Sequence, residues 1–507
     1  MKRTYIIAFI LVVFSTFSCN DDFLTLEPKG TALETNFYRT EEELYQGLVS
    51  VYDVLQWGGR NGWTMQLGLM NAASDDCLAG GSDASDQPSW VAMDNFTLTP
   101  SLGPQAGLWS KYYTGIARAN LVLEKLAGAS SDIKESFINR ATAEVKFLRA
   151  YYYFELVRLF GNPVLTLERI NPDGINTQKQ VTSAEVYAQI EADLRDAYNT
   201  FDLPATVPLS ETGRVTLGAV TSLLGKVILY QNDPARMAEA ATLFEEVISS
   251  GIYALETDYG KIFDPNNEWG VESIFEINHS ENQRGGYGNF GNGETEGNYN
   301  IQFFGMRDFI PSGTAGSIFG AGWGFCPVSE SLVEFMKNDP RFAHTIIDGK
   351  ALIASGASYS AGYQNTDYFI RKYCPIESLR AGDGEPALNW RMNEKVIRYA
   401  DVLLMCAEAH ALSGNDARAR TLTNRVRSRV GLQPLNSSGA ALVDAIYRER
   451  RMELATEGHR FFDLVRSGRA VEFLGPLGFT ANKNEVLPLP QVEIDISNGV
   501  IKQNNNY

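Results

Sequence analysis

Histidine is scarce in this chain of 507 residues, which contains only His279, His344, His410 and His459. None of the four falls in HExxH or in another spacing that is typical of a metal site. His410 lies in an apolar helical run, where packing or solvation is the simpler interpretation. The sequence also lacks a GxSxG turn and a cysteine with an evident histidine partner, so the usual nucleophilic hydrolase motifs are absent.

Basic residues are also fewer than acidic residues. Lysine and arginine total 44 against 61 acidic residues, which gives a formal net charge of −17, and no run is rich in Lys or Arg. Nucleic acid is therefore excluded as a partner, and a strongly anionic ligand would need a local basic pocket. Hydrophobic residues make up 44% and aromatic residues 11% of the chain. This composition is typical of a globular protein.

A glycine-rich run lacks the context that a nucleotide site requires. Residues Gly286 to Gly291 match GxGxxG, but the polar run from Asn292 to Gly297 follows where a helix N-terminus should begin. The sequence therefore predicts no dinucleotide site here.

Long apolar runs are confined to the N-terminus. Two basic residues precede the apolar run Tyr5–Phe17, which ends just before Cys19. About 13 residues form roughly 20 Å of helix, short of the ~30 Å bilayer core, so residues 1–18 are predicted to be a secretory signal. A cysteine at this place is the lipid acceptor of bacterial lipoproteins, and acyl chains on Cys19 would anchor the mature chain. The alternative is an ordinary signal with an incidental cysteine, and Thr16 departs from the usual leucine of the lipobox.

The remaining cysteines form no CxxC pair. In an exported protein Cys326 and Cys374 are the best candidates for a disulfide. Cys406 lies in an apolar helical run and is expected to be a buried free thiol.

Helical patterns dominate both ends of the chain. Apolar residues at steps of three and four predict a helix through residues 143–157, ended by Gly161-Asn162-Pro163. Further helices are expected over 109–126 and 183–198. Leu217–Ser250 and Arg398–Val430 each resemble a helical hairpin with an Asn-Asp turn and a length of about 34 residues, the tetratricopeptide period. The two copies are far apart, so they suggest a broken array; two unrelated hairpins are the alternative.

The middle of the chain is different in character. A strand is expected over 273–278, and residues 279–325 then show no helical period and are predicted to form long loops. Aromatic residues in such loops can stack on the flat faces of sugar rings, although each could equally be a core residue beneath a loop. The candidates for ligand contact are Trp63, Trp90, Tyr287, Tyr299 and, most favoured because glycines flank it, Trp323. Tyr151–Tyr153 lie on a helix and are interpreted as structural, and Asp75-Asp76 as a turn or cap.

The most distinctive run, residues 446–466, is rich in both charges. Glu449, Arg450 and Glu453 lie along the edge of an apolar helix face, where buried charges must be paired. Arg460, Asp463 and Arg466 are available beyond Gly458. We expect a buried ion network rather than a catalytic site.

The run ERRMELATEGHRFFDLVRSG resembles the motif of SusD/RagB outer-membrane lipoproteins. Further matching residues lie across the mature chain: Trp109, Tyr112, Ile116, Asn120, Ala143-Glu144, Phe147–Ala150, Phe160-Gly161, Arg214–Thr216, Arg398–Leu404, Leu487–Pro490, Glu493 and Ile494. The resemblance implies a mainly α fold of tetratricopeptide-like hairpins with a loop-rich ligand-binding region. It implies one domain over 19–507, helical to about 260, irregular over about 261–390 and helical again from about 391.

The resemblance also implies a function. Such proteins cap a SusC-like TonB-dependent transporter, bind mostly glycans, and use aromatic residues near an early loop and a mid-chain insertion, here the surroundings of Trp90 and Trp323. It implies no catalysis. No cofactor and no metal-binding site residue are predicted, and whether a structural ion is bound stays open. The leading hypothesis is an outer-membrane lipoprotein, facing the cell exterior, that captures an oligosaccharide for a transporter, with Asp21-Asp22 as an export label. A RagB-like peptide binder and a glycoside hydrolase remain alternatives, since carboxylates distant in sequence can meet in space.

Overall fold

The computed structural model describes residues 37–58, 63–170, 172–280, 286–287, 296–312, 318–380, 382 and 384–507. The predicted signal segment and Cys19 lie outside these residues, as does most of the Gly286–Gly291 run. Among the described residues, no helix combines the length and apolar character needed to cross a bilayer.

The N-terminal half is mainly helical. Its helices are α3 (Glu41–Gln56), α4 (Gln66–Ala72), α5 (Pro88–Asp94), α6 (Gln105–Ala127), α7 (Glu135–Phe160), α8 (Ser183–Tyr198), α9 (Leu217–Tyr230) and α10 (Met237–Ser249). Among them, α3 packs against α6, and the helices from α6 to α10 then pack as successive neighbours. The capping box of α8, in which Thr182 and Glu185 satisfy each other's backbone N–H groups, fixes its predicted start. Gly161, with φ +72°, ends α7 as expected.

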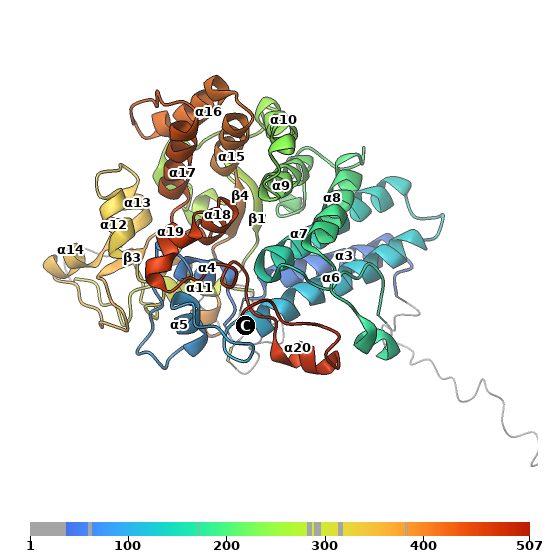
Figure 1. Cartoon of the computed structure of the whole chain (residues 1–507), viewed down its shortest axis with the longest axis horizontal. Coiled ribbons are helices and arrows are strands. Elements are labelled where there is room, and N and C mark those ends of the chain that lie inside the picture. Colours follow the sequence, from blue (N-terminus) through green and yellow to red (C-terminus); the bar gives the residue numbers. More distant parts are fainter. Residues whose placement is uncertain are drawn as a thin grey trace, which may run out of the picture.

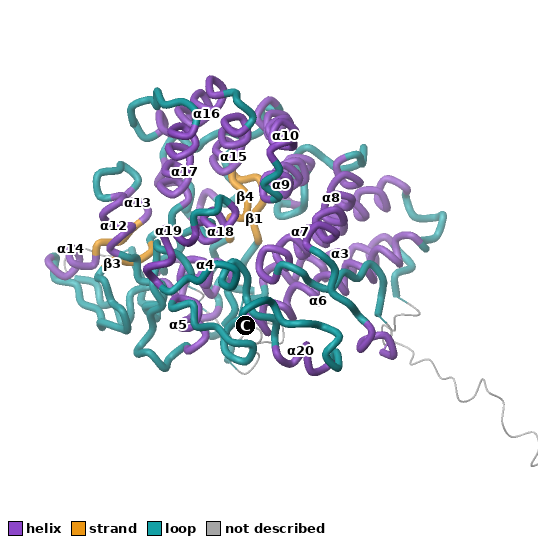
Figure 2. The backbone as a smooth tube through the Cα atoms, in the orientation of Figure 1, coloured by secondary structure: helices purple, strands orange, loops and turns teal. Residues whose placement is uncertain are grey.

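The second half alternates short elements with longer helices. Its strands are β1 (Ser273–Ile277), β2 (Ile346–Asp348), β3 (Tyr368–Ile370) and β4 (Glu394–Arg398). Its helices are α11 (Tyr299–Phe304), α12 (Glu330–Met336), α13 (Phe342–Thr345), α14 (Gly349–Ala354), α15 (Tyr399–Leu412), α16 (Asp416–Arg429), α17 (Ala440–Leu454), α18 (Arg460–Arg466), α19 (Ala470–Leu474) and α20 (Gln491–Ile496). Figure 2 shows the strands as small patches among helices, paired as antiparallel β1–β4 and β2–β3.

The two predicted hairpins join in space. Helix α10 packs against both α9 and α15, so the array that is interrupted in sequence continues as an arc from α3 through α8 to α16 (Figure 1). Gly225 allows the close approach of α9 and α10, because a Cβ there would lie 2.7 Å from the ring of Phe244. The fold class predicted from the sequence, a mainly helical protein, is confirmed.

The middle of the chain is less irregular than its sequence indicates. Helix α11 interrupts the predicted loops, and all six of its residues are buried. A helix of fewer than two turns that is buried on every side has no separate apolar and polar faces. Its sequence therefore shows no helical hydrophobic period. It lies beside α4 in the lower part of Figure 1.

Candidate functional site

Four of the five predicted ligand-binding aromatics meet around α11. The ring of Trp63 lies 5.3 Å from that of Trp323 and 6.1 Å from that of Tyr299, in both cases edge to face. Phe303 lies beneath them, with its ring 5.2 Å from each of the two tryptophan rings. Trp63 and Trp323 are partly buried, so each retains exposed surface, whereas Tyr299 is 5% exposed. The pair forms an aromatic platform, the name used below for Trp63 and Trp323.

Trp90 belongs to the core beneath this platform. Its side chain is 0% exposed and stacks on Phe303 at 5.1 Å, and its Nε1 donates a hydrogen bond to the carbonyl of Trp63 at 3.1 Å. Gly68 makes room for it, since a Cβ there would lie 2.4 Å from the indole. A ring without exposed surface offers no face to a sugar, so in this structure Trp90 supports the platform rather than providing a stacking surface.

A polar rim lies next to Trp323. The Arg307 guanidinium donates to the carbonyl of Trp323 at 3.2 Å and lies 3.8 Å from the carboxylate of Asp86. Asp86 in turn accepts hydrogen bonds from the backbone and hydroxyl of Ser82. Both charged side chains are about one-third exposed or less, 30% and 27%. Aromatic faces with adjacent charged hydrogen-bonding groups suit a polyhydroxylated ring, which has apolar C–H faces and polar edges.

Tyr287 stands apart from the platform. Its side chain is 54% exposed, and burial of its hydroxyl end together with the nearby charge of Glu385 raises its pKa. None of the ring contacts recorded for the described residues joins it to Trp63 or Trp323. Its predicted role in ligand binding stays a prediction.

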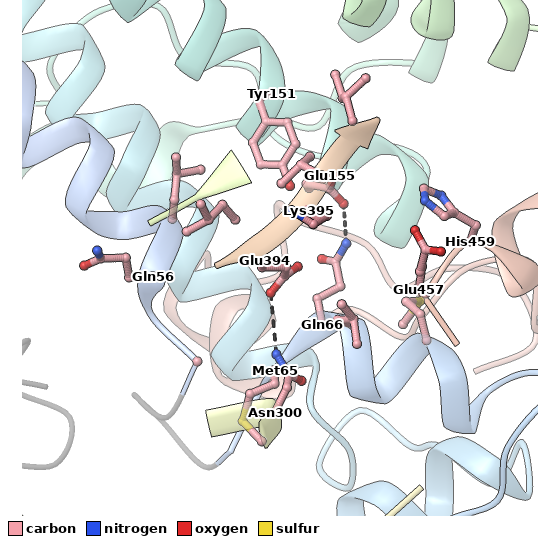
Figure 3. A pocket seen from close by; sticks show the side chains of 18 of the residues that line it. Gln56, Met65, Gln66, Tyr151, Glu155, Asn300, Glu394, Lys395, Glu457 and His459 are labelled. Carbon is pink, nitrogen blue, oxygen red and sulfur yellow. Dashed lines mark hydrogen bonds between the residues drawn. The ribbon is translucent and has the colours of Figure 1, made fainter. Parts of the chain in front are cut away.

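A narrow cavity lies below the platform, between Tyr299 and the start of β4. Its volume is about 80 Å³, and Figure 3 shows Glu155, Glu394 and Gln66 pointing into it. Gln66 donates to Glu155, and Asn300 of α11 donates to Glu394 at 3.5 Å. At ~10–15 Å³ of probe-occupied space per water, the cavity holds several water molecules.

Burial shifts the pKa values of the acidic and basic groups of this cavity in opposite directions. Desolvation raises the pKa of Glu394 to about 7, opposed by the nearby Lys111 ammonium. Desolvation lowers the pKa of Lys111 to about 8, opposed by Glu394 and Glu155. Perturbed carboxyl groups can mark an active site. Here burial accounts for the raised pKa of Glu394, and Lys111 and Glu155 are the charged groups that act on it.

The charged C-terminal run forms the expected buried network, with partners from far along the chain. Glu453 of α17 pairs with Arg398, Arg341 and Arg429 at 2.8, 2.9 and 2.5 Å. Arg450 pairs with Asp401 at 2.8 Å and with the predicted partner Asp463 at 3.2 Å. The sequence did not indicate the arginines contributed by β4, α16 and the segment before α13.

Two predictions about local chemistry have different outcomes: Asp75 and Asp76 lie at a bend after α4, as the turn interpretation expects, whereas the disulfide suggested for Cys326 and Cys374 is not formed. Asp75 and Asp76 act as ion-pair acceptors, because Arg451 lies 2.9 and 2.8 Å from them and Arg460 lies 2.7 Å from Asp75. Cys326 and Cys374 are both free and belong to different apolar clusters, so no disulfide joins them. Cys406 is a buried free thiol, as predicted.

A helical body that presents partly exposed aromatic rings beside charged groups is typical of a ligand-binding protein. Two family models match the chain, "SusD family" over residues 271–507 and "Starch-binding associating with outer membrane" over residues 22–229. A laminarin-binding SusD-like protein of known structure is 41% identical, with a TM-score of 0.86 over 93% of this chain and 100% of that one. The chain belongs to the SusD family.

Other relatives agree. Surface glycan-binding protein A from Bacteroides thetaiotaomicron, solved with laminarihexaose, is 29% identical with a TM-score of 0.83, over 92% of this chain and 100% of that one. SusD-like protein P25 from Formosa agariphila is 26% identical over the whole of both chains. The resemblance to SusD proteins is confirmed, and so is the prediction of a protein that is not an enzyme, since these relatives are named as SusD-like or glycan-binding proteins and not as enzymes.

Proposed function

We propose that the chain is a cell-surface lipoprotein that captures laminarin-type oligosaccharides and delivers them to a SusC-like TonB-dependent transporter. The observation that carries the proposal is the aromatic platform, where two partly exposed indole rings meet at 5.3 Å although Trp63 and Trp323 are far apart in sequence. Folding brings the two rings together at a partly exposed surface beside charged groups. Rings with only a packing role would be expected to be buried in the core.

The ligand class is supported by the relatives. One relative is named for laminarin binding and another was solved with laminarihexaose. The net charge of −17 favours a neutral glycan over an anionic one. The leader sequence supports lipidation at Cys19, and the match to the family "Starch-binding associating with outer membrane" supports an outer-membrane location; the outward orientation and the transporter partner are part of the proposal.

Calorimetric titration of the purified chain tests the ligand. Laminarihexaose is expected to bind more tightly than cellohexaose or maltohexaose of the same length, and mixed peptides are not expected to bind. Binding to peptides alone would replace the proposal with a RagB-like peptide carrier. New reducing ends that accumulate with time would establish a hydrolase.

The anchoring and delivery steps need separate measurements. Radiolabelled palmitate is expected in the wild-type protein and not in Cys19→Ala, which should leave the cell surface. Detergent extraction of intact cells should co-purify a TonB-dependent transporter with the wild-type chain. Glycan uptake should be lost in cells that lack this protein. Equal uptake with and without the protein, in cells that still bind the glycan, would contradict delivery.

A further inference from the structure

A thiol, an imidazole and a carboxylate meet where α10 packs against α15, at the upper edge of the view in Figure 1. Cys406 and His410 lie one turn apart on the same face of α15, and Glu245 reaches them from α10. Their ligand atoms lie within 4.8 Å of one another. The Glu245 Oε1 atom is 2.9 Å from His410 Nε2 and 3.7 Å from Cys406 Sγ.

These distances suit a tetrahedral metal ion. Zinc bonds of about 2.3 Å to sulfur and 2.0–2.1 Å to nitrogen or oxygen place neighbouring ligand atoms roughly 3.3–3.6 Å apart. The two observed separations lie on either side of this range. Thiolate, imidazole and carboxylate together favour Zn²⁺ or a similar borderline ion over Mg²⁺ or Ca²⁺, which prefer oxygen ligands alone.

We propose that Cys406, His410 and Glu245 form a three-ligand site for a divalent transition-metal ion of the zinc class, with water as the fourth ligand. The site lies within the helical array, away from the aromatic platform, and does not depend on the glycan-binding proposal. Because its ligands come from α10 and α15, a bound ion would join the two hairpins that are separated by about 150 residues of sequence.

Arg418 of α16 holds the carboxylate of this cluster. Its guanidinium makes two hydrogen bonds of 2.6 Å to the two oxygens of Glu245. The Arg418 side chain is 37% exposed, so it can swing toward solvent without leaving a buried cation. An incoming ion would replace its positive charge beside the carboxylate. Arg418 is therefore a competitor of the metal, and its removal should strengthen binding rather than weaken it.

Metal binding has defined consequences for protons. The Cys406 thiol must release its proton to solvent, because the thiolate is the ligand. His410 must bind through Nε2 and carry its proton on Nδ1. The amide nitrogen of Asn415 lies 3.4 Å from Nδ1, while its oxygen accepts from the backbone N–H of Arg418 at 3.3 Å, so Asn415 would have to turn its amide to accept from a protonated Nδ1.

Cobalt(II) is a sensitive probe of this site, because thiolate ligation gives an intense near-ultraviolet charge-transfer band. The experiment uses the purified chain without residues 1–19, which precede the described residues. Co²⁺ should produce the band, Zn²⁺ should displace it with one equivalent, and Zn²⁺ should raise the melting temperature as any ligand of the native state does.

Substitutions separate this site from other cysteines. Cys406→Ser should abolish the band, and His410→Gln should weaken binding by more than the ~100-fold upper limit for loss of an outer partner. Cys374→Ser and His344→Gln are matched controls outside the cluster and should bind as wild type. Arg418→Leu should bind at least ~5-fold more tightly, because the exposed ion pair no longer competes.

The result that overturns the proposal is absence of a thiolate band in wild type and in Arg418→Leu alike. A band that persists in Cys406→Ser, or binding that Arg418→Leu leaves unchanged or weakens, would contradict it equally. If Cys406→Ser fails to fold, His410→Gln and Arg418→Leu still decide the matter, because they predict changes of opposite sign.

Discussion

The ion network around α17 and the aromatic platform differ in how far their side chains are buried and paired. In the network, Glu453 is 0% exposed and has three arginine partners. On the platform, Trp63 and Trp323 touch each other and Phe303 yet remain partly exposed. The network has its partners within the chain, whereas the platform has ring faces that the described residues do not fully cover.

This difference separates structural from functional use of costly side chains. Removing two charges from water is unfavourable unless both are paired, so the network holds helices and strands in one arrangement. A partly hydrated aromatic surface stabilises the free protein less than a fully buried one would. A ligand that covers this surface gains the remaining burial energy. Substitutions should therefore reduce stability in one region and affinity in the other.

The largest effect is expected from Glu453→Gln. The change leaves Arg341, Arg398 and Arg429 with less negative charge around them, and breaking a buried network of this kind costs up to about 5 kcal/mol. Urea unfolding of the purified protein measures the loss. Glu330→Gln, at an exposed position on α12, is the matched control and should change stability by less than about 0.5 kcal/mol. Equal stabilities for the two variants would show that the network is not structural.

Trp90→Ala should also act on stability. The indole fills space between Gly68, Phe303 and Phe325, and truncation of a buried tryptophan costs about 3–5 kcal/mol. Thermal unfolding followed by circular dichroism gives the change. The folded fraction should still bind glycan, although more weakly, because Trp63 loses the donor that fixes its backbone. Unchanged stability together with lost binding would reassign Trp90 to the ligand site.

Trp323→Ala should change affinity with little effect on unfolding. Loss of an aromatic contact at the centre of an interface costs about 1–3 kcal/mol, or roughly 5- to 150-fold in Kd for laminarihexaose. Phe201→Ala is the control, since that ring is 100% exposed and belongs to the connection between α8 and α9. Full affinity in a folded Trp323→Ala protein would remove the platform from the site.

The platform shows where sequence reasoning was sufficient and where it was not. The candidates Trp63, Trp90, Tyr299 and Trp323 could be selected because aromatic residues in predicted loops suit stacking on sugar rings. Their exposure could not be derived, since it depends on α11, a helix too short and too uniformly buried to leave a period. Trp90 became core and Trp63 became surface through contacts between segments more than 200 residues apart.

The long helices were predictable for the opposite reason. Helix α8 begins and ends where its sequence indicates, at Ser183 and Tyr198, because a capping box and a single apolar face are local signals. The pairing of the network is not local: the acids of α17 could be recognised as buried, but Arg341 and Arg429 could not be named as their partners. The apolar clusters that separate Cys326 from Cys374 were equally invisible in the sequence.

A pH-dependent effect is expected from Glu394, which lines the cavity next to Tyr299. Because its folded-state pKa is raised to about 7, the folded protein binds a proton that the unfolded chain releases above about pH 4.5. Stability should therefore fall as pH rises from about 5 to 7, and Glu394→Gln should flatten this slope. Melting temperatures measured across that range test the sign, with Glu330→Gln as the control. A variant that keeps the full slope would mean that the carboxylate of Glu394 is already ionised at pH 5, held by Lys111 and Asn300.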